Sequence, residues 1–174
     1  MYLISIYFDD VTNKCISGYM KQIGKATGNK LMLDGNVPPH ITIAAFHVES
    51  EVAAREIFFR REEDLKLGNV QWVSVGAFLP GVIYITPILN RYLHQLSEMY
   101  DEKISNTSGV SADYRYIPFN WFPHCTLAKR LTNEQLTAAF SVMQKYFVPF
   151  EGKITKIGLS KTNPYTELEV INMT

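Results

Sequence analysis

The sequence PHITIA at residues 39–44 occurs again, with two changes, as PHCTLA at residues 123–128. Proline, histidine, threonine and alanine are identical in both copies, and the fifth position is aliphatic in each. Side chains alternate between the two faces of a strand, so the histidine, threonine and alanine of each copy point to one face. The intervening apolar residues point the other way, into a core. We predict two strands that each present an imidazole and a hydroxyl on a common face.

The surroundings of the two copies are also similar. A strand, a helix and a hairpin follow each histidine, and Gly76 and Gly158 occupy corresponding places in the two hairpins. Frequent hairpins favour antiparallel pairing. We therefore predict an α+β fold with two pseudo-symmetric lobes of mainly antiparallel sheet, flanked by helices around a central cleft. Residues 1–174 form a single bilobal domain in this interpretation, and each lobe supplies one histidine.

Local signals place the remaining elements. Residues 2–8 form an apolar strand, and a helix follows that is capped at Asp9 or Asp10 and ends at Gly28. The two strands that carry the motifs span 40–46 and 124–130. The helices run over about 50–65, 87–104 and 132–146. The hairpins cover 70–86 and 152–171. Pro87 suits a first helical turn, and Thr132 opens a capping box. Residues 29–39 and 105–120 are predicted to be loops.

Composition restricts the class of protein. The chain has 174 residues, of which 47% are apolar, and Lys plus Arg equal Asp plus Glu at 17 each. Such a balance lacks the basic footprint of a duplex-binding protein but allows a nucleotide or a short RNA. Two distant cysteines and no apolar run of membrane-spanning length indicate a cytoplasmic protein without membrane contact. We expect a monomer.

The repeated side chains suit phosphodiester chemistry. Imidazole has an unperturbed pKa of about 6.5, so His40 and His124 can exchange protons with the attacking and leaving oxygens near neutral pH. The hydroxyls of Thr42 and Thr126 can donate to the phosphate oxygens, whose charge grows in the transition state. These four residues supply a base, an acid and an electrostatic clamp, and the reaction requires no metal and no cofactor.

The paired motifs resemble those of the 2H phosphoesterases, a family that includes 2′-5′ RNA ligase-like proteins and cyclic phosphodiesterases. The segment WFPHCTLAKR at residues 121–130 is especially similar to that family. The resemblance covers nearly the whole chain. It implies a bilobal sheet with a central cleft, His40 and His124 as the acid–base pair, and Thr42 and Thr126 on the phosphate. The substrate would carry a 2′,3′-cyclic phosphate or a 2′-5′ phosphodiester, and the motifs do not select between them.

Four further residues are weaker candidates for substrate binding. Arg130 shares the strand face of His124, six residues further on, and could reach a substrate phosphate or the rim of the cleft, or be a solvated strand end. Tyr84 could stack on a base or simply pack in the core. Tyr114 and Arg115 combine aromatic and basic character in the long loop, and they could close over a nucleotide or form an ordinary exposed loop.

Other functions remain open from the sequence. The fold could serve as a non-catalytic module that binds a nucleotide or an RNA end, or as a structural protein that binds a partner. A zinc site is disfavoured because the other two histidines, His47 and His94, have no ligands at suitable spacing. A Cys–His nucleophilic pair is disfavoured because Cys125 faces away from His124.

Overall fold

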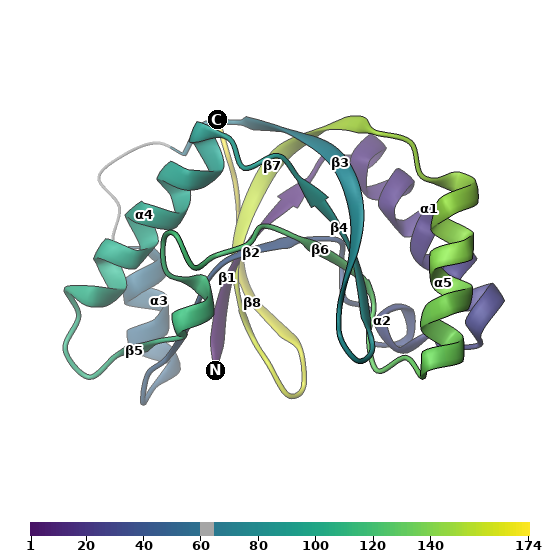
Figure 1. Ribbon diagram of the computed structural model, residues 1–174. Helices are drawn as coiled ribbons and strands as arrows, with labels where there is room; N and C mark the ends of the chain where they lie inside the picture. The colour runs from purple at the N-terminus through teal and green to yellow at the C-terminus, as the bar shows by residue number, and fades with distance from the viewer. Residues whose placement is uncertain (60–64) are drawn as a thin grey trace.

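Antiparallel pairing joins the strands of the computed structural model, which describes residues 1–59 and 65–174 (Figure 1). The strands are β1 (Tyr2–Phe8), β2 (Ile41–His47), β3 (Gly68–Phe78), β4 (Val82–Pro87), β5 (Ser111–Ala112), β6 (Cys125–Ala128), β7 (Phe150–Lys161) and β8 (Thr166–Asn172). The helices are α1 (Asp10–Thr27), α2 (Leu31–Asp34), α3 (Glu51–Phe59), α4 (Arg91–Ser105) and α5 (Asn133–Tyr146), with a 3₁₀ turn η1 (Tyr114–Tyr116). The predicted α+β class, with an antiparallel sheet and flanking helices, is confirmed.

Strand β7 connects the two halves of the sheet. Its residues 154–161 pair with β1, its residues 156–161 pair with β8 on the other edge, and its first part pairs with β3. The strand order in the described chain is β5-β2-β1-β7-β3-β4-β6, with β8 also on β7. The two lobes expected from the sequence are therefore parts of one hydrogen-bonded sheet.

The two hairpins exchange places between the halves. The hairpin β3–β4 follows the first motif in sequence, but β4 pairs with β6, which carries the second motif. The hairpin β7–β8 follows the second motif, but β7 pairs with β1, the neighbour of β2. The strand after His124 thus pairs directly with a strand from the first half of the chain, whereas the strand after His40 is joined to β7 of the second half through β1.

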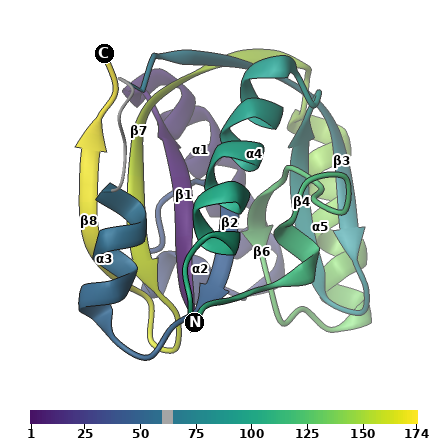
Figure 2. The ribbon, with the colours of Figure 1, turned by 90° about the vertical axis from the view of Figure 1, so that its left-hand side faces the viewer.

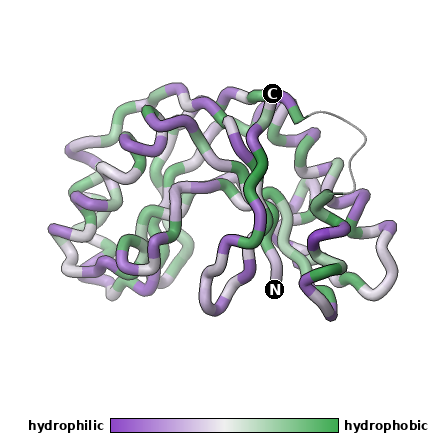
Figure 3. The backbone as a smooth tube through the Cα atoms, turned by 180° about the vertical axis from the view of Figure 1, so that it is seen from behind, coloured by the Kyte–Doolittle hydropathy of each residue, from purple (hydrophilic) through white to green (hydrophobic). Residues whose placement is uncertain are grey.

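Helices cover the sheet at its two ends. In Figure 1, α1 and α5 lie together on one side, next to α2, whereas α3 and α4 lie on the other side. Seen from that second side, α4 stands in front of the strands and α3 lies beside β7 and β8 (Figure 2). The apolar side chains between helices and strands form the core, which includes Ile4, Ile6, Ile16, Phe58, Trp72, Leu93, Tyr100 and Ile157. The turn between β7 and β8 projects away from this core and is hydrophilic (Figure 3).

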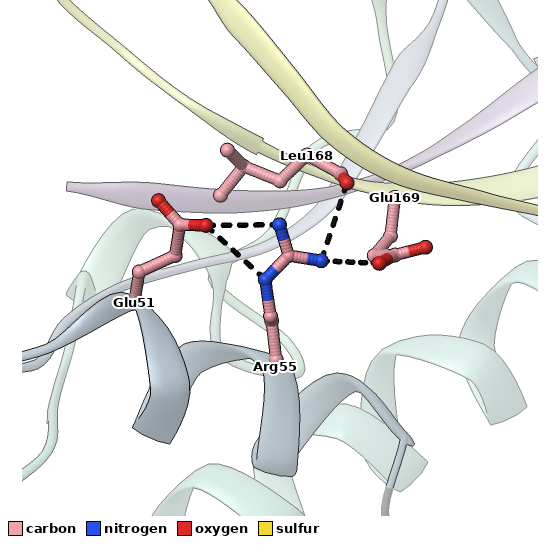
Figure 4. Close-up of polar contacts among 4 residues, drawn as sticks. All are labelled: Glu51, Arg55, Leu168 and Glu169. Carbon is pink, nitrogen blue, oxygen red and sulfur yellow. Dashed lines mark hydrogen bonds and ion pairs between the residues drawn. The ribbon is translucent and has the colours of Figure 1, made fainter.

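An ion-pair cluster ties α3 to the sheet. The guanidinium of Arg55 donates to Glu51 one turn earlier, and also to Glu169 and the Leu168 carbonyl of β8 (Figure 4). Two acceptors on β8 and one on α3 hold the planar guanidinium in one orientation. This cluster anchors α3 to β8, on the side of the sheet that lies away from α1 and α5.

Capping residues place most of the helix ends that the sequence predicts. Asp9 accepts from the backbone of Thr12 at the start of α1, Gly28 ends the helix in a left-handed conformation, and Thr132 forms a capping box with Gln135. The prediction for Pro87 is wrong. It ends β4 opposite Trp72, and α4 begins after Asn90, whose side chain accepts from the Leu93 N–H.

Three other boundaries differ from expectation. The loop 29–39 contains the single helical turn α2, and the loop 105–120 contains β5 and η1. Strand β6 ends at Ala128 and not at residue 130. Helix α3 is described to Phe59, and the part of the predicted helix at residues 60–64 lies outside the described residues.

Candidate active site

The two motif histidines have the same local geometry. His40 directly precedes β2 and His124 directly precedes β6. The Nδ1 of His40 lies 2.8 Å from the Pro38 carbonyl oxygen, and the Nδ1 of His124 lies 2.8 Å from the Phe122 carbonyl oxygen. A carbonyl can only accept, so Nδ1 carries the proton in both rings. Nε2 is then the nitrogen that remains for proton exchange with a substrate.

The motif strands follow the predicted alternation of faces. The side chains of Ile41, Ile43, Cys125 and Leu127 are buried in the core. Thr42 lies on the opposite face, where its hydroxyl is 3.5 Å from the Ser5 hydroxyl across the sheet. That distance is at the limit of hydrogen bonding, so the Thr42 hydroxyl remains able to donate to an anion.

The register repeats around each threonine. Thr42 lies opposite Ser5, and Ser5 lies opposite Gly158. Thr126 lies opposite Tyr84, and Tyr84 lies opposite Gly76. The two glycines therefore occupy equivalent positions in the sheet. Gly158 lies in line with Thr42 of the first motif, and Gly76 lies in line with Thr126 of the second motif.

Each glycine makes room for a tyrosine. A Cβ at residue 76 would lie 2.5 Å from the Tyr84 hydroxyl, and a Cβ at residue 158 would lie 2.8 Å from the Tyr7 ring. The ring centre of Tyr84 is 5.5 Å from that of His124, and the ring centre of Tyr7 is 6.3 Å from that of His40. Each histidine therefore has a tyrosine beside it, and the position of that tyrosine ring requires a glycine on the neighbouring strand.

Two contacts bring the motifs together, although β2 and β6 are not paired in the sheet. The indole Nε1 of Trp121 donates to the Thr42 carbonyl at 2.9 Å, and both groups are buried. The backbone N–H of His40 donates to the Cys125 sulfur. Because these bonds join residues of one motif to residues next to the other, the two histidines are held in one region.

Burial lowers the pKa of both histidines. For His40 the loss of hydration is the main cause, the bond to the Pro38 carbonyl opposes it, and the charges of His124 and Lys129 lower the pKa further. For His124 burial lowers the pKa and the bond to Phe122 opposes it. The effect of the His124 charge on His40 shows that the imidazoles are within electrostatic range. Both rings therefore favour the neutral form in the absence of an anion.

Cys125 is unsuited to nucleophilic chemistry. Its side chain is buried, and burial raises the pKa of the thiol to about 12. The thiolate form needed for attack is therefore scarce at neutral pH.

The weaker candidates divide into two groups. Tyr84 lies beside His124, and Tyr114 and Arg115 line a cavity that also contains His124. Arg115 is bound to Asp113 through its Nε and Nη2 atoms, so an acidic partner offsets its charge. The strand-face argument for Arg130 is wrong, because β6 ends at Ala128 and Arg130 has a left-handed backbone with φ of 58°. Its role in binding stays a prediction.

Several residues near the histidines were not predicted from the sequence. Ser5 is the polar residue within the otherwise apolar strand 2–8, and this break in the pattern could have indicated it. Tyr7 follows on the same face of β1, and its hydroxyl bonds to that of Tyr165 at 3.3 Å. Lys129 follows the second motif, and its charge lowers the pKa of His40. The link from Trp121 to Thr42 joins distant segments and has no local signal.

The described residues contain no group of three or more His, Cys, Asp or Glu side chains placed to hold a metal ion. Independence from metal remains a prediction. Within the same residues, no helix combines the length and the apolar character needed to cross a membrane.

Comparison with known proteins identifies the family. A family model described as the 2′-5′ RNA ligase superfamily matches residues 19–165. The chain belongs to this superfamily. The resemblance to 2H phosphoesterases is thereby confirmed for most of the chain. No sequence match is found among curated proteins.

Several solved structures share the fold at low sequence identity. A structure described as a phosphoesterase has 18% identity and a TM-score of 0.70, with 99% of this chain and 97% of that chain covered. E. coli LigT complexed with 3′-AMP has 18% identity, a TM-score of 0.67 and the same coverage. The protein TT0787 of Thermus thermophilus has 15% identity and a TM-score of 0.64, again with 99% and 97% coverage. These similarities support the fold.

The bond between Trp121 and Thr42 can be tested with a matched pair of variants. Trp121→Phe leaves the buried Thr42 carbonyl without its donor, at a cost of about 1–3 kcal/mol beyond the lost packing. Trp72→Phe also removes a buried indole, but the Nε1 of Trp72 has no hydrogen-bond partner among the described residues. We expect Trp121→Phe to lower the free energy of unfolding more than Trp72→Phe, as measured by urea denaturation. Equal losses would contradict a stabilising role for this bond.

Proposed function

We propose that the protein is a phosphodiesterase that acts on 2′,3′-cyclic phosphates or 2′-5′ phosphodiesters by acid–base catalysis with His40 and His124. The observation that carries this proposal is the matched pair of Nδ1–H donations to backbone carbonyls. They orient two imidazoles in the same way and leave two Nε2 atoms for the reaction. The bonds that tie the motifs together keep both rings at one site.

The reaction follows from these positions. One Nε2 takes a proton from the attacking water or hydroxyl, and the other, in its protonated form, gives a proton to the leaving ribose oxygen. The P–O bond to the incoming oxygen forms as the bond to the leaving oxygen breaks. Thr42 and Thr126 donate hydrogen bonds to the non-bridging oxygens, where negative charge increases. A substrate phosphate also favours protonation of the nearby imidazoles, which offsets the effect of burial on their pKa.

Comparison with the structural relatives supports a nucleotide as the substrate. Structures of E. coli LigT are described as complexes with 3′-AMP, with ATP and with phosphate. We extend this class of ligand to the present chain and propose a nucleotide or a short RNA end as the substrate. In this proposal a monomer performs the reaction in the cytoplasm, with no metal or cofactor.

Removal of either histidine tests the proposal directly. We expect His40→Ala and His124→Ala each to reduce turnover of 2′,3′-cyclic AMP by about 10²- to 10⁴-fold, because a general acid or base is lost. The double variant should lose less than the product of the two single losses, because the groups act as a unit. His47→Ala is a matched control, since this exposed histidine lies at the far end of β2. A folded His40 or His124 variant with near wild-type turnover would leave a binding module as the better interpretation.

The dependence of the reaction rate on pH should reflect the ionisation of both histidines. One must be neutral and the other protonated, so the rate is bell-shaped and its limbs belong to the coupled pair. Burial lowers both pKa values in the free protein. The optimum of kcat/KM should therefore lie below the ordinary histidine pKa of about 6.5, and the optimum of kcat should lie higher because bound phosphate favours protonation. A kcat/KM that is flat up to alkaline pH would contradict the mechanism.

Metal removal is the third test. Protons and hydrogen bonds carry the proposed reaction, so exhaustive treatment with EDTA should leave the hydrolysis rate unchanged. The rate is measured before treatment, after treatment and after addition of Mg²⁺, Mn²⁺ or Zn²⁺. Loss of activity that a divalent ion restores would show that the chemistry is misassigned.

A further inference from the structure

A cavity of about 860 Å³ opens beside His124 and is lined mainly by aromatic rings. Phe78, Tyr114, Tyr116, Phe119 and Phe122 contribute these rings. The volume is in the range of cavities that hold nucleotide-sized ligands. The cavity therefore extends the catalytic region on one side with a surface suited to flat, apolar groups.

The rings are unusually exposed for their size. Phe119 is 89% exposed, Tyr114 is 72% exposed, and Phe122 and Phe78 are 45% and 41% exposed. Exposed apolar surface that is gathered in one place commonly marks a binding site. Phe119 also has a left-handed backbone with φ of 67°, which a bulky residue rarely adopts. Such local strain is typical of functional positions.

The rings nearest the histidine are held in place by one another. Phe78 lies edge-on to His124 at 4.8 Å between ring centres, and it packs on Tyr84 at 4.4 Å. Phe122 lies edge-on to Phe78 at 6.2 Å. Tyr84 rests over Gly76, as described above. This arrangement forms the wall of the cavity beside the His124 ring before any ligand binds.

The surroundings of His40 have a different chemistry. Its aromatic neighbour is Tyr7, which is buried and whose hydroxyl bonds to the Tyr165 hydroxyl. Lys156 lies opposite Tyr7 in the sheet, and the charge of Lys129 reaches His40. This side thus carries hydroxyl and ammonium groups, whereas the His124 side carries the faces and edges of phenyl rings.

We propose that the aromatic cavity binds the nucleobase of the substrate, so that the nucleoside lies on the His124 side and the polar remainder points toward His40. This inference rests on the proposed function. Base–aromatic stacking tolerates any base and contributes strongly to binding of nucleic-acid fragments. Asn120 lines the same cavity, and its amide N–H donates to the Tyr114 carbonyl, which leaves its side-chain oxygen to accept from a base. Arg115 is already bound to Asp113, so stacking, not charge, carries the recognition.

The test compares a substrate with a base to one without. Hydrolysis of 2′,3′-cyclic AMP is measured beside that of methyl riboside 2,3-cyclic phosphate, which has the same reacting group. Wild-type protein should favour the nucleotide in kcat/KM. Phe119→Ser and Tyr114→Ser should each reduce kcat/KM for the nucleotide by roughly 5- to 100-fold, the usual effect of losing one stacking ring. Neither variant should alter turnover of the abasic compound.

Matched variants separate stacking from general damage to the surface. Phe119→Tyr and Tyr114→Phe keep a ring and should keep the preference for the nucleotide. Phe140→Ser removes a partly exposed ring from α5, outside the cavity, and should change neither substrate. Equal kcat/KM for the two compounds in the wild type, or loss of activity on both in the ring variants, would overturn the proposal.

Binding is measured in parallel, so that failure of catalysis does not decide this question. Calorimetry with AMP and with ribose 5-phosphate requires no turnover. We expect AMP to bind more tightly, and the advantage to disappear in Phe119→Ser. If neither cyclic compound nor 2′-5′-linked diadenylate is hydrolysed but AMP keeps this advantage, the phosphodiesterase proposal fails and the base-binding cavity stands. If AMP and ribose 5-phosphate bind equally, the cavity proposal fails whatever the activity.

Discussion

Pairing along strand β7 is the constraint on which the position of both histidines depends. Its last part bonds to β1, which supports the strand of His40, and its first part bonds to β3, which leads to the strand of His124. Each backbone group in these ladders would be costly to leave without a partner in the interior. The separation of the two motifs is therefore set by a continuous sheet and not by a flexible connection. For the proposed reaction, a geometry of this kind would need little reorganisation.

The two imidazoles are equal in orientation but unequal in environment. Each donates Nδ1–H to a carbonyl two residues earlier, which the repeated Pro-His pair makes possible. The differences arise in the neighbours. A hydrogen-bonded tyrosine pair and lysine charge lie near His40, whereas a cluster of phenyl rings lies near His124. Internal repetition thus supplies the two imidazoles to which the proposed function assigns proton transfer, and divergence of the surrounding strands makes the two ends of the site chemically different.

The sequence predicts what depends on local patterns. Alternation along the motif strands places Ile41 and Cys125 in the core, and the caps at Asp9 and Thr132 are correct because they are satisfied within one helical turn. The helix does not start at Pro87 because this residue still pairs with β3 at the end of β4, beyond the pairing of β4 with β6, and Asn90 offers a cap three residues later. The family was predicted correctly from the repeated motif.

Features that depend on distant contacts escaped prediction. The exchange of hairpins cannot be read from a strand order along the chain, because either hairpin could pair with either motif strand. The aromatic cavity combines residue 78, the loop at 114–120 and residue 122, and of these only Tyr114 and Arg115 stand out in the sequence. The link from Trp121 to the first motif is of the same kind.

The exchange of hairpins also means that neither half of the chain holds a complete lobe. A break between α4 and β5 would leave one fragment with His40 and β1 to β4, and another with His124 and β6 to β8. The first fragment would lack β7, which joins its two strand pairs, and the second would lack β1, β3 and β4, the partners of β7 and β6. A complete sheet, with His40 and His124 in one site, would form only where both fragments meet. With the proposed activity as the signal, this fold therefore offers a division point for a split protein that reports the proximity of two fused partners.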